Sequence, residues 1–229
     1  MSWALVPAAG SGRRFGGETP KQYLRAAGKT LIEHALDALL SHPQIEGVVV
    51  ALAPNDVLWP GWTERHGKLV STCLGGRERA DSVLAAVRAL PPDLAVDELL
   101  LVHDAARPNL QHDDLSRLIE AATTGPDGAI LAAPLRDTLK RAGSDARIVA
   151  TEPRDALWRA FTPQAFRRGL LERALAQALA EGVTVTDEAM AVERLGRHPR
   201  LVEGREDNLK VTTPADLALA EFLLARRSA

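Results

Sequence analysis

The feature that most constrains the fold of this chain is a repeated alternation of short apolar runs with amphipathic stretches. Each run holds only a few residues and is rich in valine, leucine or isoleucine. Runs of this length and composition are typical of strands that are buried on both faces of a sheet. We therefore predict strands over residues 3–6, 48–52, 69–74, 99–102 and 129–133.

Helical patterns lie between these runs. Thr30-Leu31-Ile32-Glu33 is a capping box, and apolar residues follow it at helical spacing. The last helix is expected to begin at Thr213-Pro214, because threonine caps helices well and proline suits the first helical position. Further helices are predicted over residues 81–90, 113–122 and 164–180. This alternation predicts an α/β fold, a Rossmann-like three-layer sandwich with a mainly parallel central sheet.

One region breaks the alternation. Residues 138–141 and 147–150 flank the turn-like sequence Ala142-Gly143-Ser144-Asp145 and could pair as a β-hairpin. A hairpin inserted in a doubly wound fold has no core of its own to cover. We interpret residues 136–153 as a protruding arm that docks on a second subunit, and we expect a homodimer. No linker, repeat or low-complexity segment interrupts the 229 residues, so one domain, residues 1–229, is expected.

Composition excludes several classes of protein. The formal net charge is −2, so no global basic field exists to bind nucleic acid or an anionic membrane. No apolar run approaches the ~18 residues that suggest a membrane span. The first residues do not resemble a signal peptide, and Cys73, the single cysteine, leaves no intramolecular disulfide. We expect a cytoplasmic protein that binds neither nucleic acid nor membrane.

The loop after the first predicted strand, residues 7–23, is the strongest sign of function. Small residues at positions 8 to 12 allow backbone N–H groups to approach an anion closely. The loop is neither a dinucleotide fingerprint, because Phe15 stands where glycine is needed, nor a P-loop. Arg14 and Lys21 add a bidentate fork and a mobile ammonium, which suit a triphosphate. The alternative is a tight turn with two solvated cations.

The same loop resembles the signature of nucleotidyltransferases that move a nucleoside monophosphate onto a phosphorylated small molecule. Its extended form, with Pro20-Lys21-Gln22-Tyr23, is similar to the 2-C-methyl-D-erythritol 4-phosphate cytidylyltransferase family of the non-mevalonate isoprenoid pathway. Four further motifs occur in family order: Gly75-Gly76-Arg77-Glu78-Arg79-Ala80-Asp81-Ser82-Val83, Val102-His103-Asp104-Ala105-Ala106-Arg107-Pro108, Thr186-Asp187-Glu188-Ala189 and Glu203-Gly204-Arg205-Glu206-Asp207-Asn208-Leu209-Lys210-Val211-Thr212.

The resemblance implies that CMP is transferred from CTP, bound with Mg²⁺ or another divalent cation, to methylerythritol phosphate. The substrate phosphate would attack the α-phosphorus in line and release pyrophosphate. A phosphomonoester, with its second pKa at ~6, is largely dianionic and needs no general base. The remaining task is to bring two polyanions together and stabilise charge on phosphorus, which requires positioned cations.

The resemblance also assigns roles to cations. Arg14 and Lys21 would stabilise the transition state around the CTP phosphates. Arg154 and Lys210 would hold the attacking phosphate. Because Arg154 lies just after the predicted arm, the arm is expected to help build the active site of the partner subunit.

Asp104 follows a predicted strand at the edge where ligands bind. It is our candidate for a metal or substrate-hydroxyl contact, since Mg²⁺ favours one or two carboxylates together with phosphate oxygens. The alternative is a turn cap. His103 is expected to be structural, and the dispersed histidines do not predict a zinc site.

The other expected contacts belong to substrate recognition. Arg107 would contact phosphate or sugar, or else pair with Asp104. Thr186 would bond the erythritol, or else cap a helix. Thr162-Pro163-Gln164 is interpreted mainly as a helix start. The complete expected substrate-binding set is Ala8, Ala9, Gly10, Gly12, Gly76, Arg77, Ser82, Asp104, Ala105, Arg107 and Thr186, in which Arg77 contributes its backbone and the alanines, Gly76 and Ser82 read cytosine.

Three other functions stay open from the sequence. The first is a cytidylyltransferase for another polyol phosphate, notably ribitol 5-phosphate. The second is a sugar-phosphate nucleotidyltransferase that uses another base. The third, from a different class, is a catalytically silent nucleotide-binding module or scaffold, which would be expected to lose the phosphate-binding cations that this chain retains.

Overall fold

The computed structural model describes residues 1–10 and 19–227, and one eight-stranded sheet runs through its centre. The strand order is β12-β8-β11-β7-β1-β4-β6-β5. The strands are β1 (Ser2–Pro7), β4 (Ile45–Leu52), β5 (Glu64–Arg65), β6 (Lys68–Leu74), β7 (Leu99–Val102), β8 (Ala129–Pro134), β11 (Trp158–Arg167) and β12 (Arg200–Glu203).

The direction of these strands is mainly parallel. β1 pairs in parallel with both β4 and β7, β4 with β6, and β8 with β12. β11 is antiparallel to β7 and β8, and the short β5 is antiparallel to β6. The order of the parallel strands reverses beside β1, which places β4 on one side and β7 on the other. Ligands of open α/β sheets bind at such a point, outside the carboxyl ends of the strands.

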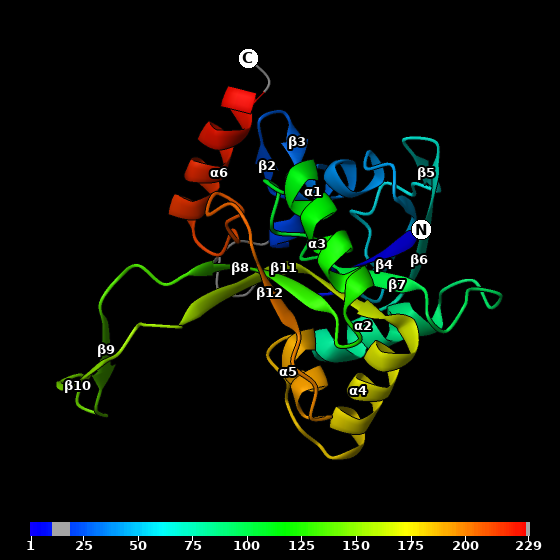
Figure 1. Cartoon of the computed structure of the whole chain (residues 1–229). Coiled ribbons are helices and arrows are strands. Elements are labelled where there is room, and N and C mark those ends of the chain that lie inside the picture. The colour runs from blue at the N-terminus through cyan, green and yellow to red at the C-terminus, as the bar shows by residue number, and fades with distance from the viewer. Residues whose placement is uncertain (11–18, 228–229) are drawn as a thin grey trace.

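Helices cover both faces of the sheet (Figure 1). α1 (Leu31–Leu40) and α3 (His112–Thr124) bury Ile32, Leu36 and Leu115 against one face. α2 (Arg79–Arg88), α4 (Arg168–Ala180) and α5 (Glu188–Glu193) bury residues such as Val83 and Leu171 against the other. The predicted three-layer α/β sandwich is confirmed.

The last helix packs outside these layers. α6 (Pro214–Arg227) buries Ala220 and Leu224 against a small hairpin of β2 (Arg25–Ala26) and β3 (Lys29–Thr30). Its predicted start is confirmed, because the Thr213 hydroxyl accepts a bond from the Asp216 backbone N–H at 3.2 Å. No helix in residues 1–10 and 19–227 is long and apolar enough to cross a membrane.

The local start signal of α1 also formed as predicted. Thr30 Oγ1 accepts a hydrogen bond from the Glu33 backbone N–H at 3.3 Å, and Glu33 Oε2 accepts one from the Thr30 N–H at 2.7 Å. This reciprocal capping box satisfies two N–H groups that a helix leaves without internal partners.

One predicted helix begins too early. Residues 164–167 lie in β11, where Gln164, Ala165 and Phe166 pair with Val102, Leu101 and Leu100 of β7, and α4 starts only at Arg168. The prediction that Thr162-Pro163-Gln164 starts a helix is therefore wrong. The pairing of β11 with β8 is irregular between Ala160 and Gln164, so Pro163 sits where the ladder is interrupted and its missing N–H is tolerated.

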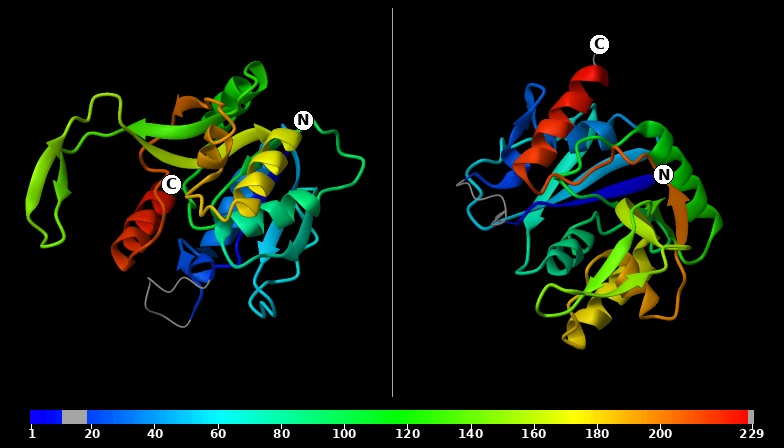
Figure 2. Two further views of the ribbon diagram at one scale, coloured as in Figure 1. Left: turned by 90° about the horizontal axis from the view of Figure 1, so that it is seen from below. Right: turned by 90° about the vertical axis from the view of Figure 1, so that its left-hand side faces the viewer.

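The predicted hairpin is present and extends away from the body of the molecule (Figures 1 and 2). β9 (Leu139–Ala142) and β10 (Ile148–Glu152) pair antiparallel, with Ala142 opposite Ile148. We call residues 136–153 the arm. In these views β9 and β10 project from the rest of the described chain, and at the base of the arm Arg136 Nε pairs with Glu206 Oε1 at 2.6 Å.

Candidate active site

A cavity of about 360 Å³ opens at the point where the strand order reverses. Its wall is built by the loops that follow β1, β6 and β7, and by the segment that precedes α6. Because parallel strands present their carboxyl ends at one edge, loops distant in the sequence meet here. The lining residues are Pro7, Ala8, Ala9, Gly10, Lys21, Gln22, Gly76, Arg77, Glu78, Arg79, Ser82, Asp104, Ala105, Ala106, Lys210 and Thr212.

The loop after β1 is held in place by its backbone. The Ala8 N–H donates to the Ala51 carbonyl at 2.8 Å, and the buried Gln22 side chain donates to the Ala8 carbonyl at 2.7 Å. Gly10 and Lys21 line the cavity from either end of this loop. Gly12 and Arg14, two of the predicted site residues, lie outside the described residues.

The loop between β6 and α2 depends on small residues. The Gly75 N–H donates to the Leu52 carbonyl at 2.8 Å, and a Cβ on Gly76 would overlap the Asp81 side chain. Ser82 Oγ accepts a hydrogen bond from the Gly76 N–H and donates to the Glu78 carbonyl, both at 3.1 Å. These contacts fix the backbone at the cavity wall, while the Arg77 side chain is exposed.

Asp104 is the most strongly paired group of the cavity. Its Oδ1 contacts Arg79 Nε at 3.0 Å, and its Oδ2 contacts Lys210 Nζ at 2.9 Å and Arg107 Nε at 3.4 Å. Burial alone would raise the pKa of Asp104, but the charges of Arg79, Lys210 and Arg107 outweigh it and hold the pKa well below its usual range. Asp104 is therefore a carboxylate at any physiological pH.

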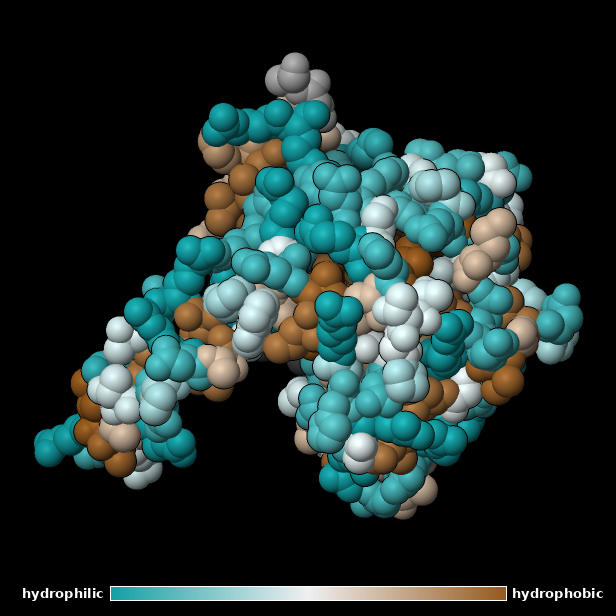
Figure 3. Space-filling view, viewed as in Figure 1, coloured by the Kyte–Doolittle hydropathy of each residue, from teal (hydrophilic) through white to brown (hydrophobic). Residues whose placement is uncertain are grey.

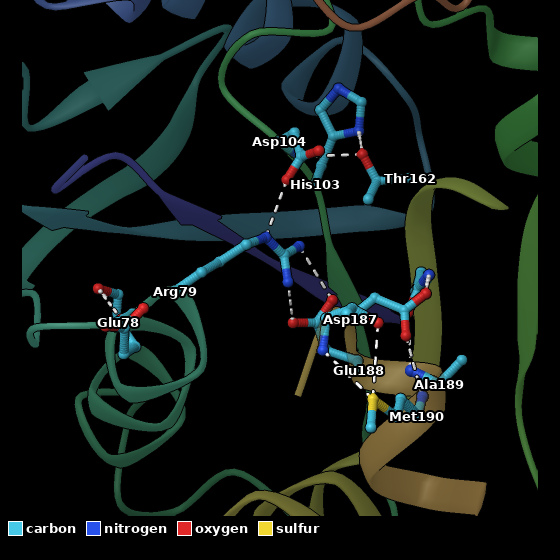
Figure 4. A network of polar contacts seen from close by, with 12 residues as sticks. Glu78, Arg79, His103, Asp104, Thr162, Asp187, Glu188, Ala189 and Met190 are labelled. Atoms are coloured by element: carbon cyan, nitrogen blue, oxygen red, sulfur yellow. Dashed lines mark hydrogen bonds and ion pairs between the residues drawn. The ribbon is translucent and has the colours of Figure 1, made fainter. Parts of the chain in front are cut away.

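Arg79 joins Asp104 to a second buried carboxylate (Figure 4). The two terminal nitrogens of Arg79 contact the two carboxylate oxygens of Glu188, with Nη2 to Oε2 at 3.0 Å. Glu188 is fully buried at the first position of α5, and burial raises its pKa although Arg79 opposes that shift. The guanidinium thus bridges α5 and the loop after β7.

His103 has the structural role that the sequence predicted. Its Nε2 lies 3.0 Å from the Arg107 carbonyl, which can only accept, so Nε2 carries the proton and Nδ1 accepts from the Thr162 hydroxyl at 3.1 Å. The ring is fully buried, which lowers its pKa to about 4. A neutral imidazole with both nitrogens bonded has no site left for substrate.

Comparison with known proteins identifies the family of the chain. The family model for IspD, 2-C-methyl-D-erythritol 4-phosphate cytidylyltransferase, matches residues 2–226. A curated protein of that name from Stenotrophomonas maltophilia (strain R551-3) is 61% identical over 226 residues, which are 99% of this chain and 97% of that relative. The chain belongs to this family.

Other members of the family agree in sequence and in fold. A protein of the same name from Xanthomonas campestris pv. campestris (strain 8004) is 63% identical over 225 residues, 98% of this chain and 85% of the relative. The crystal structure of the Francisella tularensis family member superposes with a TM-score of 0.83 at 32% identity, covering 97% of this chain and 99% of that chain. The crystal structure of the Thermus thermophilus family member gives a TM-score of 0.79 at 35% identity, covering 99% of this chain and 100% of that chain.

The family resemblance assigns four cations to catalysis, and two of them meet at the cavity in the described part of the chain. Lys21 and Lys210 line the same cavity. Arg154 lies at the base of the arm, is exposed, and donates from Nη1 to the Arg136 carbonyl. Arg154 is not among the residues that line the cavity with Lys210.

Neither Arg107 nor Thr186 is among the residues that line the cavity. Arg107 is buried, donates to the Asn208 carbonyl at 2.7 Å and pairs with Asp104, so the alternative interpretation as an ion pair is seen. Thr186 is exposed and donates to Met190 Sδ at 3.6 Å. Thr186 is not the helix cap, because α5 is capped one residue later by Asp187, whose Oδ1 accepts from the Met190 N–H at 2.9 Å. A substrate contact for either residue stays a prediction.

Sequence reasoning missed Gln22, Arg79 and Glu188. All three stand inside the family motifs, but their contacts join segments far apart in the sequence. One local signal was available for Arg79. It is the first residue of α2, where a cation is disfavoured by the helix dipole, so its presence there calls for a compensating anion.

A divalent cation in this cavity would need substrate phosphate oxygens as ligands beside Asp104. Mg²⁺ in proteins takes one or two carboxylates together with substrate phosphate oxygens. Asp104 is the buried carboxylate of the lining, although both of its oxygens already contact cations. Among the described residues, no group of three or more His, Cys, Asp or Glu side chains could hold a metal ion alone. A divalent cation here would share Asp104 with Arg79, Lys210 and Arg107.

Proposed function

We propose that this chain transfers CMP from CTP to 2-C-methyl-D-erythritol 4-phosphate, giving 4-diphosphocytidyl-2-C-methyl-D-erythritol and pyrophosphate. The observation that carries the proposal is the family match over residues 2–226, with Lys21 and Lys210 on the wall of one cavity. The family's own name states this substrate, and the cavity supplies cations where two phosphorylated ligands would meet.

The nucleophile in this reaction is the substrate phosphate itself. A dianionic phosphomonoester needs no proton removed, and His103 offers no competing base, since it is neutral and bonded at both nitrogens. Rate acceleration would come from alignment and from positive charge held around the crowded phosphorus. The phosphate oxygen attacks the α-phosphorus and pyrophosphate leaves opposite it.

CTP would bind along the loops after β1 and β6. Backbone groups of Ala8, Ala9 and Gly76, with Ser82 behind them, would read the cytosine edge. Gly10, Gly12, Arg14 and Lys21 would hold the triphosphate, and Arg77 would contribute its backbone. The close packing at Gly75 and Gly76, where a Cβ would overlap neighbouring side chains, supports a backbone role.

The polyol phosphate would bind near Asp104, Ala105, Arg107 and Thr186. Lys210 contacts Asp104 in this structure and would turn to the incoming phosphate, which is a stronger anionic partner. Asp104 would then accept a polyol hydroxyl or contact the divalent cation. That cation, Mg²⁺ in our proposal, would travel with CTP and neutralise charge on its phosphate oxygens.

A second copy of the chain would complete this site. We propose a homodimer in which the arm carries Arg154 to the substrate phosphate of the partner. The arm has exposed apolar side chains, Ile148 at 68% and Val149 at 67%, and Figure 3 shows apolar surface on it. Such side chains on a projecting hairpin favour burial against another molecule. Within this dimer, residues 1–229 would act as one catalytic domain, and we propose the cytoplasm as its compartment.

Pyrophosphate release tests this function. The chain is mixed with CTP and Mg²⁺, and with methylerythritol phosphate or ribitol 5-phosphate in parallel. We expect rapid release with methylerythritol phosphate and at least about tenfold slower release with ribitol phosphate, on the order of one lost polar contact. Faster release with ribitol phosphate would assign the chain to the other polyol. Release with UTP or ATP in place of CTP would point to another base, and no release with any pair would leave a silent binding module.

A further inference from the structure

The Arg79 side chain connects two carboxylates that come from distant parts of the chain (Figure 4). Its Nε faces Asp104 Oδ1 at 3.0 Å, and its two terminal nitrogens face the two oxygens of Glu188. A planar guanidinium that is bound on two edges has no rotational freedom left. Arg79 is thereby fixed as a rigid link between α5 and the loop after β7.

The residues on both sides of Glu188 are hydrogen-bonded to neighbouring elements. The neighbouring Asp187 caps α5 and accepts a hydrogen bond from Gln164 Nε2 at 2.8 Å. The other end of the same amide, Gln164 Oε1, accepts from the Ala189 N–H at 2.9 Å. These bonds tie the first turn of α5 to β11 on both sides of Glu188. The backbone at Glu188 is therefore fixed, and its carboxylate is presented to Arg79 from a turn that is bonded on both sides.

Glu188 does not line the cavity, yet a short chain of ion pairs joins it to Lys210. The sequence of contacts is Glu188 to Arg79, Arg79 to Asp104 Oδ1, and Asp104 Oδ2 to Lys210. Arg79 thus fixes Oδ1 of Asp104, and Oδ2 is left facing Lys210 at 2.9 Å, with Arg107 Nε farther away at 3.4 Å. Without Glu188, the charge of Arg79 could instead turn to any phosphate in the cavity.

Stability alone is a poor reason for this buried carboxylate. A carboxylate and a guanidinium lose their hydration when they are buried, and well-packed apolar residues are often as stable in their place. We infer that Glu188 is a positioning residue: acting through Arg79, it orients Asp104 toward Lys210 and keeps the Arg79 charge from the phosphate site. This inference rests on the proposed cytidylyl transfer.

The Glu188→Gln variant tests the inference, because it keeps the size of the side chain and removes the charge. We expect kcat/KM for methylerythritol phosphate to fall about tenfold, as for the loss of one charge-assisted contact, with the KM for CTP changed by less than about twofold. The Asp37→Asn variant is the matched control. Asp37 also pairs with two cations, Lys29 and Arg65, and contacts the His66 ring, but on α1 and outside the cavity lining. Its loss should therefore lower thermal stability and leave kcat/KM unchanged.

A double variant separates positioning from simple structural support. If Glu188 acts through Arg79, then Glu188→Gln combined with Arg79→Gln should be no slower than Arg79→Gln alone. Losses that multiply would overturn the inference, as would a Glu188→Gln variant with wild-type kinetics. If Glu188→Gln fails to fold, the double variant is still compared with Arg79→Gln, since it removes both charges together. A wild-type chain without turnover would instead refute the proposed function.

Discussion

At the scale of single residues, the scarcity of lysine separates two kinds of cation. The chain has five lysines among its 28 lysine and arginine residues. Three of them have local structural contacts: Lys29 with Asp37 at 2.8 Å, Lys68 with the His42 carbonyl at 2.6 Å, and Lys140 with Thr151 Oγ1 at 2.6 Å. The other two, Lys21 and Lys210, line the cavity. A compact ammonium on a flexible stem suits a charge that must move between partners.

Lysine should therefore not be replaceable by arginine at the cavity. In Lys210→Arg the charge is kept, but a planar fork cannot take the single close contact with Asp104 Oδ2 and then turn to a phosphate. We expect kcat to fall by about tenfold to a hundredfold in steady-state assays. Lys29→Arg, on the surface pair with Asp37, serves as the control and should retain full turnover. Equal activity of both variants would mean that lysine at 210 reflects composition only.

The glycine at position 76 gives a second prediction at this scale. Gly76→Ala places a methyl group onto the Asp81 side chain and displaces the N–H that Ser82 Oγ holds. CTP binding, measured by calorimetry, should weaken at least about tenfold, roughly the loss of one well-aligned hydrogen bond. Gly125→Ala is the control, because its nearest neighbour would be an ordinary contact at 3.7 Å. An unchanged affinity for CTP would mean that the loop between β6 and α2 does not bind the nucleotide.

His103 predicts how stability depends on pH. Its folded pKa of about 4 lies below the unfolded value of 6.5, so the unfolded chain binds an extra proton between these values. The free energy of unfolding should thus fall as pH drops from about 6.5 to about 4, by up to about 3 kcal/mol from this group. The free energy of unfolding, measured with urea at several pH values in that range, should fall more steeply with decreasing pH for the wild type than for His103→Gln. Identical slopes would refute the neutral, buried imidazole.

At the scale of helices and strands, sequence patterns correctly predicted the features that depend on residues close to one another in the chain. The capping box at Thr30 was correct because its partner Glu33 lies three residues away. The apolar strand runs were correct because a strand buried on both faces is apolar whichever strands it pairs with. The start of α4 was wrong because pairing with β7 outweighs the helical spacing of residues 164–167. The Arg79–Glu188 pair was missed for the same reason, since its partners are 109 positions apart.

The arm shows the same limit on prediction. A turn sequence between short alternating segments was enough to predict the hairpin of β9 and β10. What the arm contacts depends on another molecule, and no pattern within residues 136–153 specifies that surface. The exposed Ile148 and Val149 indicate only that a contact is favourable.

At the scale of the whole molecule, the proposed homodimer needs two chains for each complete active site. Arg154→Ala and Lys210→Ala should each be nearly inactive as pure proteins. When the two are unfolded together, mixed and refolded, statistical pairing gives hybrids in which one site carries both native residues. Turnover should recover to about a quarter of the wild-type value.

No recovery in a mixture that light scattering shows to be dimeric would mean that Arg154 serves its own chain or no site. A control mixture of Arg154→Ala with the inactive double variant Arg154→Ala/Lys210→Ala should not recover, because no hybrid then contains a complete site.

The central claim is that the substrate phosphate attacks the α-phosphorus of CTP, and isotope labelling tests it most directly. Methylerythritol phosphate carrying ¹⁸O on its phosphate is incubated with the chain, CTP and Mg²⁺, and the products are separated and weighed by mass spectrometry. We expect one pyrophosphate for each cytidine diphosphate ester, with all of the label in the ester and none in the pyrophosphate. Labelled pyrophosphate, or pyrophosphate released with CMP and no ester, would contradict it.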